Sequence, residues 1–115
     1  MNFFEHRDGE MFAENIKVSE IAKSISTPFY LYSTASLTYQ FNQIKEAFRN
    51  TDHLICYAVK ANTNQAVIKT LGDLGAGADV VSEGEMRRVL KAGIPAFKIV
   101  YSGVAKTAQE MTFAL

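Results

Sequence analysis

The stretch HLICYAVK, residues 53–60, decides the fold. It is short, apolar and free of glycine and proline, which is typical of a buried β-strand. Apolar residues recur at helical spacing after it: Val67, Ile68, Leu71 and Leu74. Gly75 is then a natural stop for this helix. A strand followed at once by a helix predicts a βα unit.

Two further units of the same kind follow along the chain. Residues 76–81 and 97–101 are the second and third predicted strands. A helix is expected after each of them, the first ending at Gly93 and the second beginning near Thr107. Both helices begin with a capping-box pattern, in which the Ser or Thr side chain and a Glu three residues later satisfy each other's backbone N–H groups: Ser82 with Glu85, and Thr107 with Glu110.

The residues before this region are less regular. Residues 1–25 contain short apolar groups separated by polar turns, which predicts short strands and one helical turn. Pro28 then breaks the chain, and the aromatic residues 29–32 predict a further strand. A helix should follow, because Leu37, Phe41, Ile44 and Phe48 fall on one face. Strands alternating with helices from there onward predict an α/β fold with a parallel sheet, open or closed as a barrel.

Composition excludes several classes of function. Twelve basic and twelve acidic side chains cancel and are mixed along the chain, so neither nucleic acid nor a charged membrane surface is an expected partner. A single cysteine, Cys56, allows no internal disulfide, and together with only His6 and His53 it indicates no metal site. We recognise no signal peptide or membrane-spanning stretch, and we therefore expect a cytoplasmic protein.

The candidate site lies where the predicted parallel strands end. Reactive groups of α/β sheets and barrels stand at the carboxyl ends of the strands, and Lys60, Asp79 and Ser102 occupy those positions. The two-residue alternation of a strand puts Ala58 and Cys56 on the side of Lys60, and the larger residues on the side facing helices. Small neighbours beside a lysine leave room for a flat ring.

Two interpretations of Lys60 remain open at this point. Burial at a strand end would disfavour the charged amine and produce a nucleophile that forms imines with carbonyl groups. Alternatively, the ammonium group extends into solvent, where it pairs with Asp79. Asp79 and Ser102 are in turn explained equally well as turn or loop residues.

Four motifs resemble one family of enzymes. YAVKAN at residues 57–62 resembles the lysine signature of the alanine-racemase-like barrel of pyridoxal-phosphate enzymes. GAGADVVSEGE at 75–85, KIVYSGVAKT at 98–107 and TPFYLY at 27–32 resemble the corresponding segments of diaminopimelate decarboxylases. One departure is Ala105, where that family usually has glycine. The sequence after Lys60 differs from that of alanine racemases, and Ala61 stands where eukaryotic-type ornithine decarboxylases usually have cysteine.

The resemblance implies both a cofactor and a reaction. Lys60 would hold pyridoxal 5'-phosphate as a Schiff base, Ala58 would touch the cofactor, and Asp79 would lie beside the lysine. The substrate would be a small amino acid, meso-diaminopimelate, decarboxylated to L-lysine in the last step of lysine biosynthesis. Alternatives are a related decarboxylase of ornithine, arginine or carboxynorspermidine, and a non-catalytic barrel that binds the same cofactor.

The resemblance also implies a larger protein. A closed (β/α)8 barrel needs about 250 residues, so this chain would supply its first three strand–helix units and be inactive alone. Residues 1–32 would join a β domain, and residues 33–115 would begin the pyridoxal-phosphate-binding TIM barrel. The full-length enzyme is expected to be a homodimer.

Overall fold

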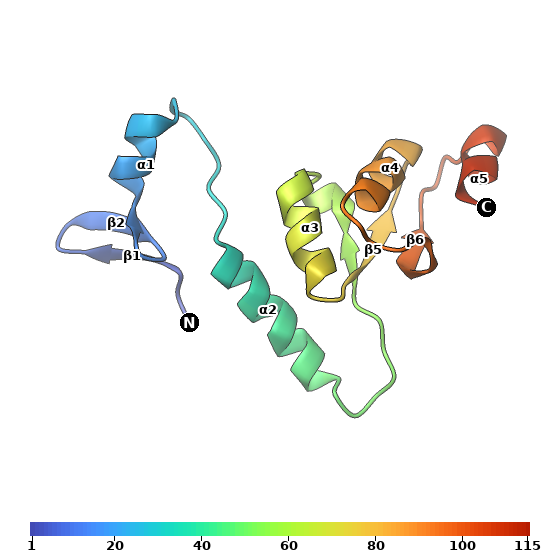
Figure 1. Ribbon diagram of the computed structural model, residues 1–115, viewed down its shortest axis with the longest axis horizontal. Coiled ribbons are helices and arrows are strands. Elements are labelled where there is room, and N and C mark those ends of the chain that lie inside the picture. Colours follow the sequence, from blue (N-terminus) through green and yellow to red (C-terminus); the bar gives the residue numbers. More distant parts are fainter. The chain divides into compact units, whose positions relative to one another are not determined.

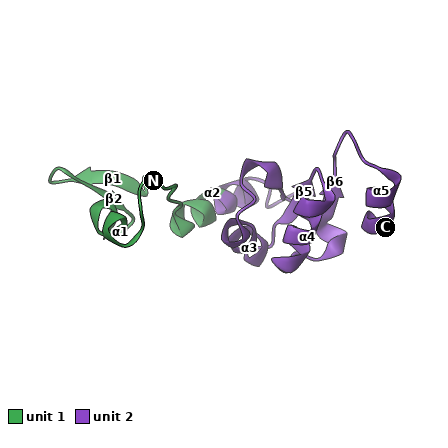
Figure 2. Cartoon of the chain, turned by 90° about the horizontal axis from the view of Figure 1, so that it is seen from above, with its two compact units in different colours: residues 1–40 green, residues 41–115 purple.

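The computed structural model describes residues 1–115, which form two compact units, residues 1–40 and 41–115 (Figures 1 and 2). In the first unit, β1 (Phe4–Arg7), β2 (Glu10–Ala13) and β3 (Ile16–Lys17) form an antiparallel sheet in that order. The helix α1 (Val18–Ser24) follows directly. The short strands and the helical turn predicted for residues 1–25 are therefore confirmed.

The hairpin between β1 and β2 is explained by its two turn residues. Asp8 and Gly9 both have positive φ, 50° and 79°. An Asp-Gly pair with positive φ at both positions matches the right-handed twist of the strands that it joins. It pairs Arg7 with Glu10 and sets the register of β1 with β2.

The carboxylate of Glu14 organises the start of α2 (Thr34–Ala47). It accepts hydrogen bonds from the Ser33 hydroxyl at 2.6 Å and from the Ala35 N–H at 3.1 Å. The Ser33 hydroxyl in turn accepts the Ser36 N–H at 2.9 Å, as an N-cap residue does. These bonds tie the β2–β3 turn to the first turn of the helix, and the helix predicted for this region is confirmed.

The strand predicted at residues 29–32 is wrong. The segment has no regular structure, no strand pairs with it, and Tyr30 is 92% exposed. Aromatic content favours a strand only where a neighbouring strand and a packed face are present.

The second unit contains the three predicted strand–helix repeats. The strands β4 (Cys56–Ala58), β5 (Gly77–Val80) and β6 (Ile99–Tyr101) form a parallel sheet in consecutive order. The helices α3 (Gln65–Asp73), α4 (Glu83–Lys91) and α5 (Ala108–Ala114) follow β4, β5 and β6 in turn (Figure 1). The α/β class and the parallel sheet are confirmed.

All three strands are shorter than predicted, and 3-10 helices adjoin two of them. The 3-10 helix η1 (Val59–Ala61) takes over after Ala58, and a second one, η2 (Ala96–Lys98), precedes β6. The apolar stretch 53–60 does not distinguish a strand from a tight turn, since both can bury a valine. The residues at its ends lie outside the ladder that pairs residues 56–58 with β5.

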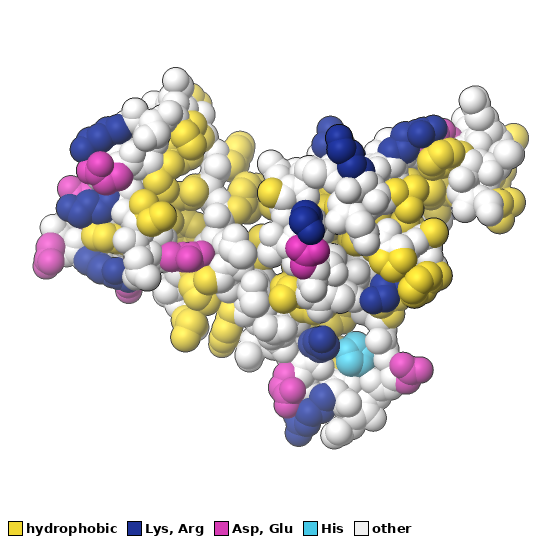
Figure 3. Space-filling view, in the orientation of Figure 1, with side chains coloured by type: hydrophobic (Ala, Val, Ile, Leu, Met, Phe, Trp, Pro, Cys, Tyr) yellow, Lys and Arg dark blue, Asp and Glu magenta, His cyan; other side chains and the backbone are white.

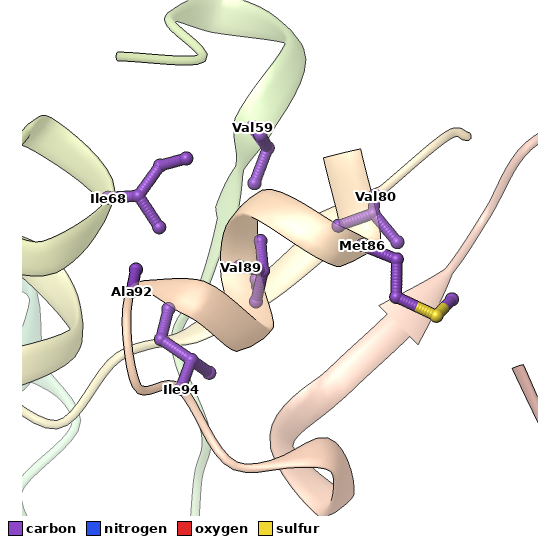
Figure 4. Packing of buried hydrophobic residues seen from close by; sticks show 8 residues of the cluster. Val59, Ile68, Val80, Met86, Val89, Ala92 and Ile94 are labelled. Carbon is purple, nitrogen blue, oxygen red and sulfur yellow. The ribbon is translucent and has the colours of Figure 1, made fainter. Parts of the chain in front are cut away.

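The core of the second unit lies between the sheet and the helices α3 and α4 (Figure 4). The buried cluster consists of Val59, Ile68, Ala78, Val80, Met86, Val89, Ala92 and Ile94. Most of its members come from the predicted apolar positions of the strands and helices. Burying such side chains is the main favourable term in folding this unit.

The predicted helix ends are largely confirmed. Gly75 and Gly93 follow α3 and α4 with φ of 102° and 92°, a conformation that glycine adopts without strain. The capping box of Thr107 and Glu110 is present in full. The other box is only half formed: Ser82 accepts the Glu85 N–H, but the Glu85 carboxylate accepts the N–H of Val81 instead of that of Ser82.

The surface charge agrees with the mixed pattern of the sequence. Lys and Arg side chains are interspersed with Asp and Glu on the face drawn in Figure 3. None of the helices combines the length and apolar character that crossing a membrane requires.

Gly77 provides a test of the close packing in the parallel sheet. A Cβ at this position would overlap the carbonyl oxygen of Lys98 and lie 2.9 Å from Cys56 Sγ. We expect Gly77→Ala to lower the free energy of unfolding by about 1–3 kcal/mol, as overpacking does. The matched control is Gly84→Ala, where the nearest atom is 3.9 Å away and alanine favours the helix. Urea unfolding measures the free energy of unfolding of both variants and of the wild type. A Gly77→Ala variant as stable as the wild type would contradict the observed packing.

Glu14 provides a test in the first unit. The hydrogen bonds from Ser33 and Ala35 lower the pKa of Glu14 below its ordinary value of 4.5. A carboxylate whose pKa is lowered by folding stabilises the fold above its unfolded pKa, and that stabilisation is lost as the pH falls through the folded pKa. We therefore expect the Ala35 amide NMR signal to titrate with a midpoint below 4.5, and Glu14→Gln to remove that titration. Glu20→Gln, a change to an exposed carboxylate paired with Lys23, should leave it intact. An unchanged titration in Glu14→Gln would contradict the assignment.

Candidate active site at the carboxyl ends of the parallel strands

The register of the parallel sheet separates its two faces. Tyr57 pairs with Ala78 and Ala78 with Ile99, and this row lies in or against the core cluster. The neighbouring row, Ala58–Asp79–Val100, must point to the opposite face, because successive residues of a strand alternate between faces. Ala58 and Asp79 are therefore direct neighbours on the side away from α3 and α4.

We call this side the small-residue face and define it by Cys56, Ala58, Gly77, Asp79 and Val100. The sheet is closely packed around Gly77, since Cys56 Sγ and the Lys98 carbonyl oxygen fill the space that a side chain at this position would need. Because Ala58 and Gly77 are small, this face has no bulky side chains between β4 and β5. A planar group can approach such a face closely.

Asp79 is the one carboxylate on the small-residue face, and it is held by the next strand. The Ser102 hydroxyl donates a hydrogen bond to Asp79 Oδ1 at 2.5 Å. The predicted convergence of these two residues is therefore observed. Asp79 Oδ2 makes no hydrogen bond within the chain.

The side chain of Lys60 extends into solvent, as the second interpretation expected, but the residue lies outside the strand in which it was predicted. It lies in η1, two residues beyond the end of β4, and it is exposed instead of buried. Its ammonium group makes no hydrogen bond or ion pair in the chain, so the pairing with Asp79 that we weighed as an alternative is also absent. The physical reason is the bend after Ala58: in a 3-10 turn, side-chain directions no longer follow the alternation of the strand.

The backbone around Lys60 is nevertheless fixed. Val59 is completely buried in the core, and the Asn62 N–H donates to the Val59 carbonyl at 3.1 Å. The Tyr57 hydroxyl donates to the Asn62 carbonyl at 3.0 Å, across the turn. Tyr57 is a positioning residue that sequence reasoning missed. The available signal was its place on the helix-facing side, where a buried tyrosine hydroxyl needs a partner.

Cys56 reports on the electrostatics of the small-residue face. Burial raises the pKa of the Cys56 thiol, and the negative charge of Asp79 raises it further. A raised pKa makes this thiol a poor nucleophile at neutral pH. Its titration therefore measures the charge on Asp79.

The remaining candidates do not form a site. His6 and His53 are exposed, and His53 Nδ1 lies 2.7 Å from the Thr51 carbonyl oxygen. No group of three or more His, Cys, Asp or Glu side chains is arranged to hold a metal ion.

Neutralising Asp79 should change the titration of Cys56. We expect Asp79→Asn to lower the pKa of the thiol, leaving only the increase due to burial. The pH dependence of Cys56 alkylation measures this shift. Asp73→Asn, which changes an exposed carboxylate paired with Lys69, serves as the control. An alkylation profile unchanged by Asp79→Asn would show that the carboxylate does not share the face with the thiol.

Known proteins with similar sequences indicate the family to which the chain belongs. The chain is 50% identical over 113 residues to a diaminopimelate decarboxylase of Aquifex aeolicus, covering 98% of this chain and 26% of that protein. It is 49% identical to a diaminopimelate decarboxylase of Pseudomonas fluorescens, covering 100% of this chain and 28% of the relative. The chain thus spans about a quarter of the length of these relatives, in their N-terminal part.

The fold points to the same group of proteins. A crystal structure of diaminopimelate decarboxylase from M. jannaschii in complex with L-lysine matches with a TM-score of 0.93 and 34% identity, covering 98% of this chain and 27% of that one. Residues 34–115 match the sequence model described as "Pyridoxal-dependent decarboxylase, pyridoxal binding domain". The chain belongs to the family of pyridoxal-dependent decarboxylases, and most of it is part of their pyridoxal-binding domain.

Proposed function

We propose that this chain is the amino-terminal part of a pyridoxal-phosphate-dependent enzyme that decarboxylates meso-diaminopimelate to L-lysine. The observation that supports the proposal is the side chain of Lys60, which is exposed and unpaired in the turn η1, two residues beyond the end of β4. The diaminopimelate decarboxylases at about 50% identity and the relative crystallised with L-lysine support this substrate over other amino acids.

The residues present fit the proposed cofactor. An aldehyde requires an accessible primary amine without a competing ion pair, and Lys60 offers one. A planar ring requires a face without bulky side chains, which Ala58 and Gly77 provide. A positive charge near the lysine is favoured by a fixed carboxylate, and Asp79 is held in place by Ser102.

Each residue has a definite task in this proposal. Pyridoxal phosphate, held by Lys60, would supply an electron sink for the electron pair left when the α-carboxylate departs as carbon dioxide. Lys60 binds the cofactor between turnovers. Ala58 allows the ring close to β4, and the negative charge of Asp79 stabilises the positive charge that develops beside Lys60.

The full-length protein has further proposed features. Residues 33–115 begin a (β/α)8 barrel, to which later strand–helix units add, and residues 1–32 join a β domain. The enzyme is proposed to be a cytoplasmic homodimer.

Substrate assays of a protein of the relatives' length, carrying this segment, test the proposal. We expect carbon dioxide release from meso-diaminopimelate to exceed that from ornithine, arginine and carboxynorspermidine. Preference for one of the other three would assign a related decarboxylase instead. Cofactor binding without release from any of them would indicate a non-catalytic barrel.

Replacing Lys60 tests its role independently of turnover. With added pyridoxal phosphate, we expect a visible absorbance band in the wild type and no band in Lys60→Ala, because Lys60 is the lysine proposed to form the imine with the cofactor. Lys69→Ala, which removes another exposed lysine of the same unit, should keep the band. A band that survives Lys60→Ala would contradict the assignment of this lysine.

A further inference from the structure

The pair formed by Ser102 and Asp79 suggests a role beyond those proposed above. Asp79 stands at the carboxyl end of β5 and pairs with Val100 in the register of β6. Ser102 follows Val100 by two residues, and its backbone N–H donates to the Val80 carbonyl at 2.9 Å. This bond continues the ladder one residue beyond β6, so the Ser102 side chain lies on the same face as Asp79.

Gly103 fixes the path of the chain at this point. A Cβ here would lie 2.5 Å from the Val81 carbonyl oxygen and 3.0 Å from Tyr101 Cε2, so only glycine fits. The backbone after Ser102 therefore passes in close contact with the end of β5. Two backbone constraints, the ladder bond and the tight passage of Gly103, bring the hydroxyl to the carboxylate.

The hydrogen bond itself occupies only half of the carboxylate. The Ser102 hydroxyl is bound to Oδ1 at 2.5 Å, and Oδ2 has no partner in the chain. The hydrogen bond to Oδ1 restricts the orientation of the Asp79 carboxylate. Oδ2 then remains available to interact with a cationic group. The pair is exposed, and an exposed hydrogen bond adds little to the stability of a fold, so orientation is the more important effect.

We propose that Ser102 is a positioning residue for the reaction: its hydroxyl holds the Asp79 carboxylate in the orientation in which the free oxygen stabilises positive charge beside Lys60. This inference rests on the proposed function, because it assigns Asp79 the task described there. It adds a residue of the third strand to the site that the first two strands form.

The test compares two substitutions of equal shape in the full-length protein loaded with pyridoxal phosphate. Ser102→Thr keeps the hydroxyl, and Ser102→Val replaces it by a methyl group. The form that absorbs in the visible carries a proton, and a positioned carboxylate favours that form. We expect Ser102→Val to lower the pH midpoint of the visible band by about 1 unit, and to lower kcat about tenfold with little change in KM. Ser102→Thr should behave like the wild type in both measurements.

A double-substitution cycle shows whether Ser102 acts through Asp79. We expect Ser102→Val to have no further effect on the band or on kcat when Asp79→Ala is already present. Ser26→Ala, a change to an exposed serine with no hydrogen bond, controls for removal of a hydroxyl and should change neither measurement. If Ser102→Val fails to fold, Ser102→Ala replaces it in the same cycle.

The outcomes distinguish this inference from the proposed function. A band that is absent from the wild type, or that survives Lys60→Ala, overturns the proposed function and this inference with it. A Lys60-dependent band whose midpoint is the same in Ser102→Val and Ser102→Thr overturns only the role of Ser102. Equal effects of Ser102→Val with and without Asp79 overturn it as well, since the hydroxyl would then act independently of the carboxylate.

Discussion

The complete burial of Val59 is the constraint on which the arrangement of the site depends. Its side chain is packed with those of Ile68, Val80 and Val89 beneath α3 and α4 (Figure 4). Because Val59 occupies the first position of the turn after β4, fixing it also fixes the backbone of Lys60. Neighbouring side chains of a 3-10 helix point about 120° apart, so anchoring the valine in the core directs the lysine away from it.

The parallel register extends this constraint across the sheet. One row of side chains, from Tyr57 through Ala78 to Ile99, faces the helices and contributes to the core. The next row faces the other way and places Ala58 beside Asp79. Hydrophobic packing on one face thus determines, through the alternation of each strand, which groups are presented on the other. One face of the three strands therefore contributes to stability, and the opposite face carries the candidate site.

Much of the fold could be predicted because its signals are local. The apolar spacing of α3, the stop at Gly75 and the capping box at Thr107 each depend on residues a few positions apart. The convergence of Asp79 and Ser102 was also predictable, since parallel strands end at a common edge. The failures have two causes. Residues 29–32 have aromatic side chains but no distant strand to pair with, and the Glu85 carboxylate has two neighbouring backbone N–H groups within reach and accepts that of Val81 instead of that of Ser82.

The setting of Lys60 could not be read from the sequence for a different reason. Strand alternation predicts its direction only if the strand continues, and whether it continues depends on which residues of β5 are available for pairing. The hydrogen bond from the Tyr57 hydroxyl to the Asn62 carbonyl likewise could not be predicted, because it depends on the conformation of the turn between them. Family resemblance directed attention to Lys60 as a member of a motif, whereas the physical description of its surroundings required the structure.

The most direct test of the central claim is to locate the lysine that binds the cofactor. The full-length protein is incubated with pyridoxal phosphate, reduced with borohydride, digested with trypsin and analysed by mass spectrometry. We expect the label in a peptide of residues 50–69 that remains uncleaved after Lys60, since trypsin does not cut at a modified lysine. A label at Lys69, Lys98 or another lysine, with Lys60 unmodified, would contradict the claim that the turn anchored by Val59 presents the reactive amine.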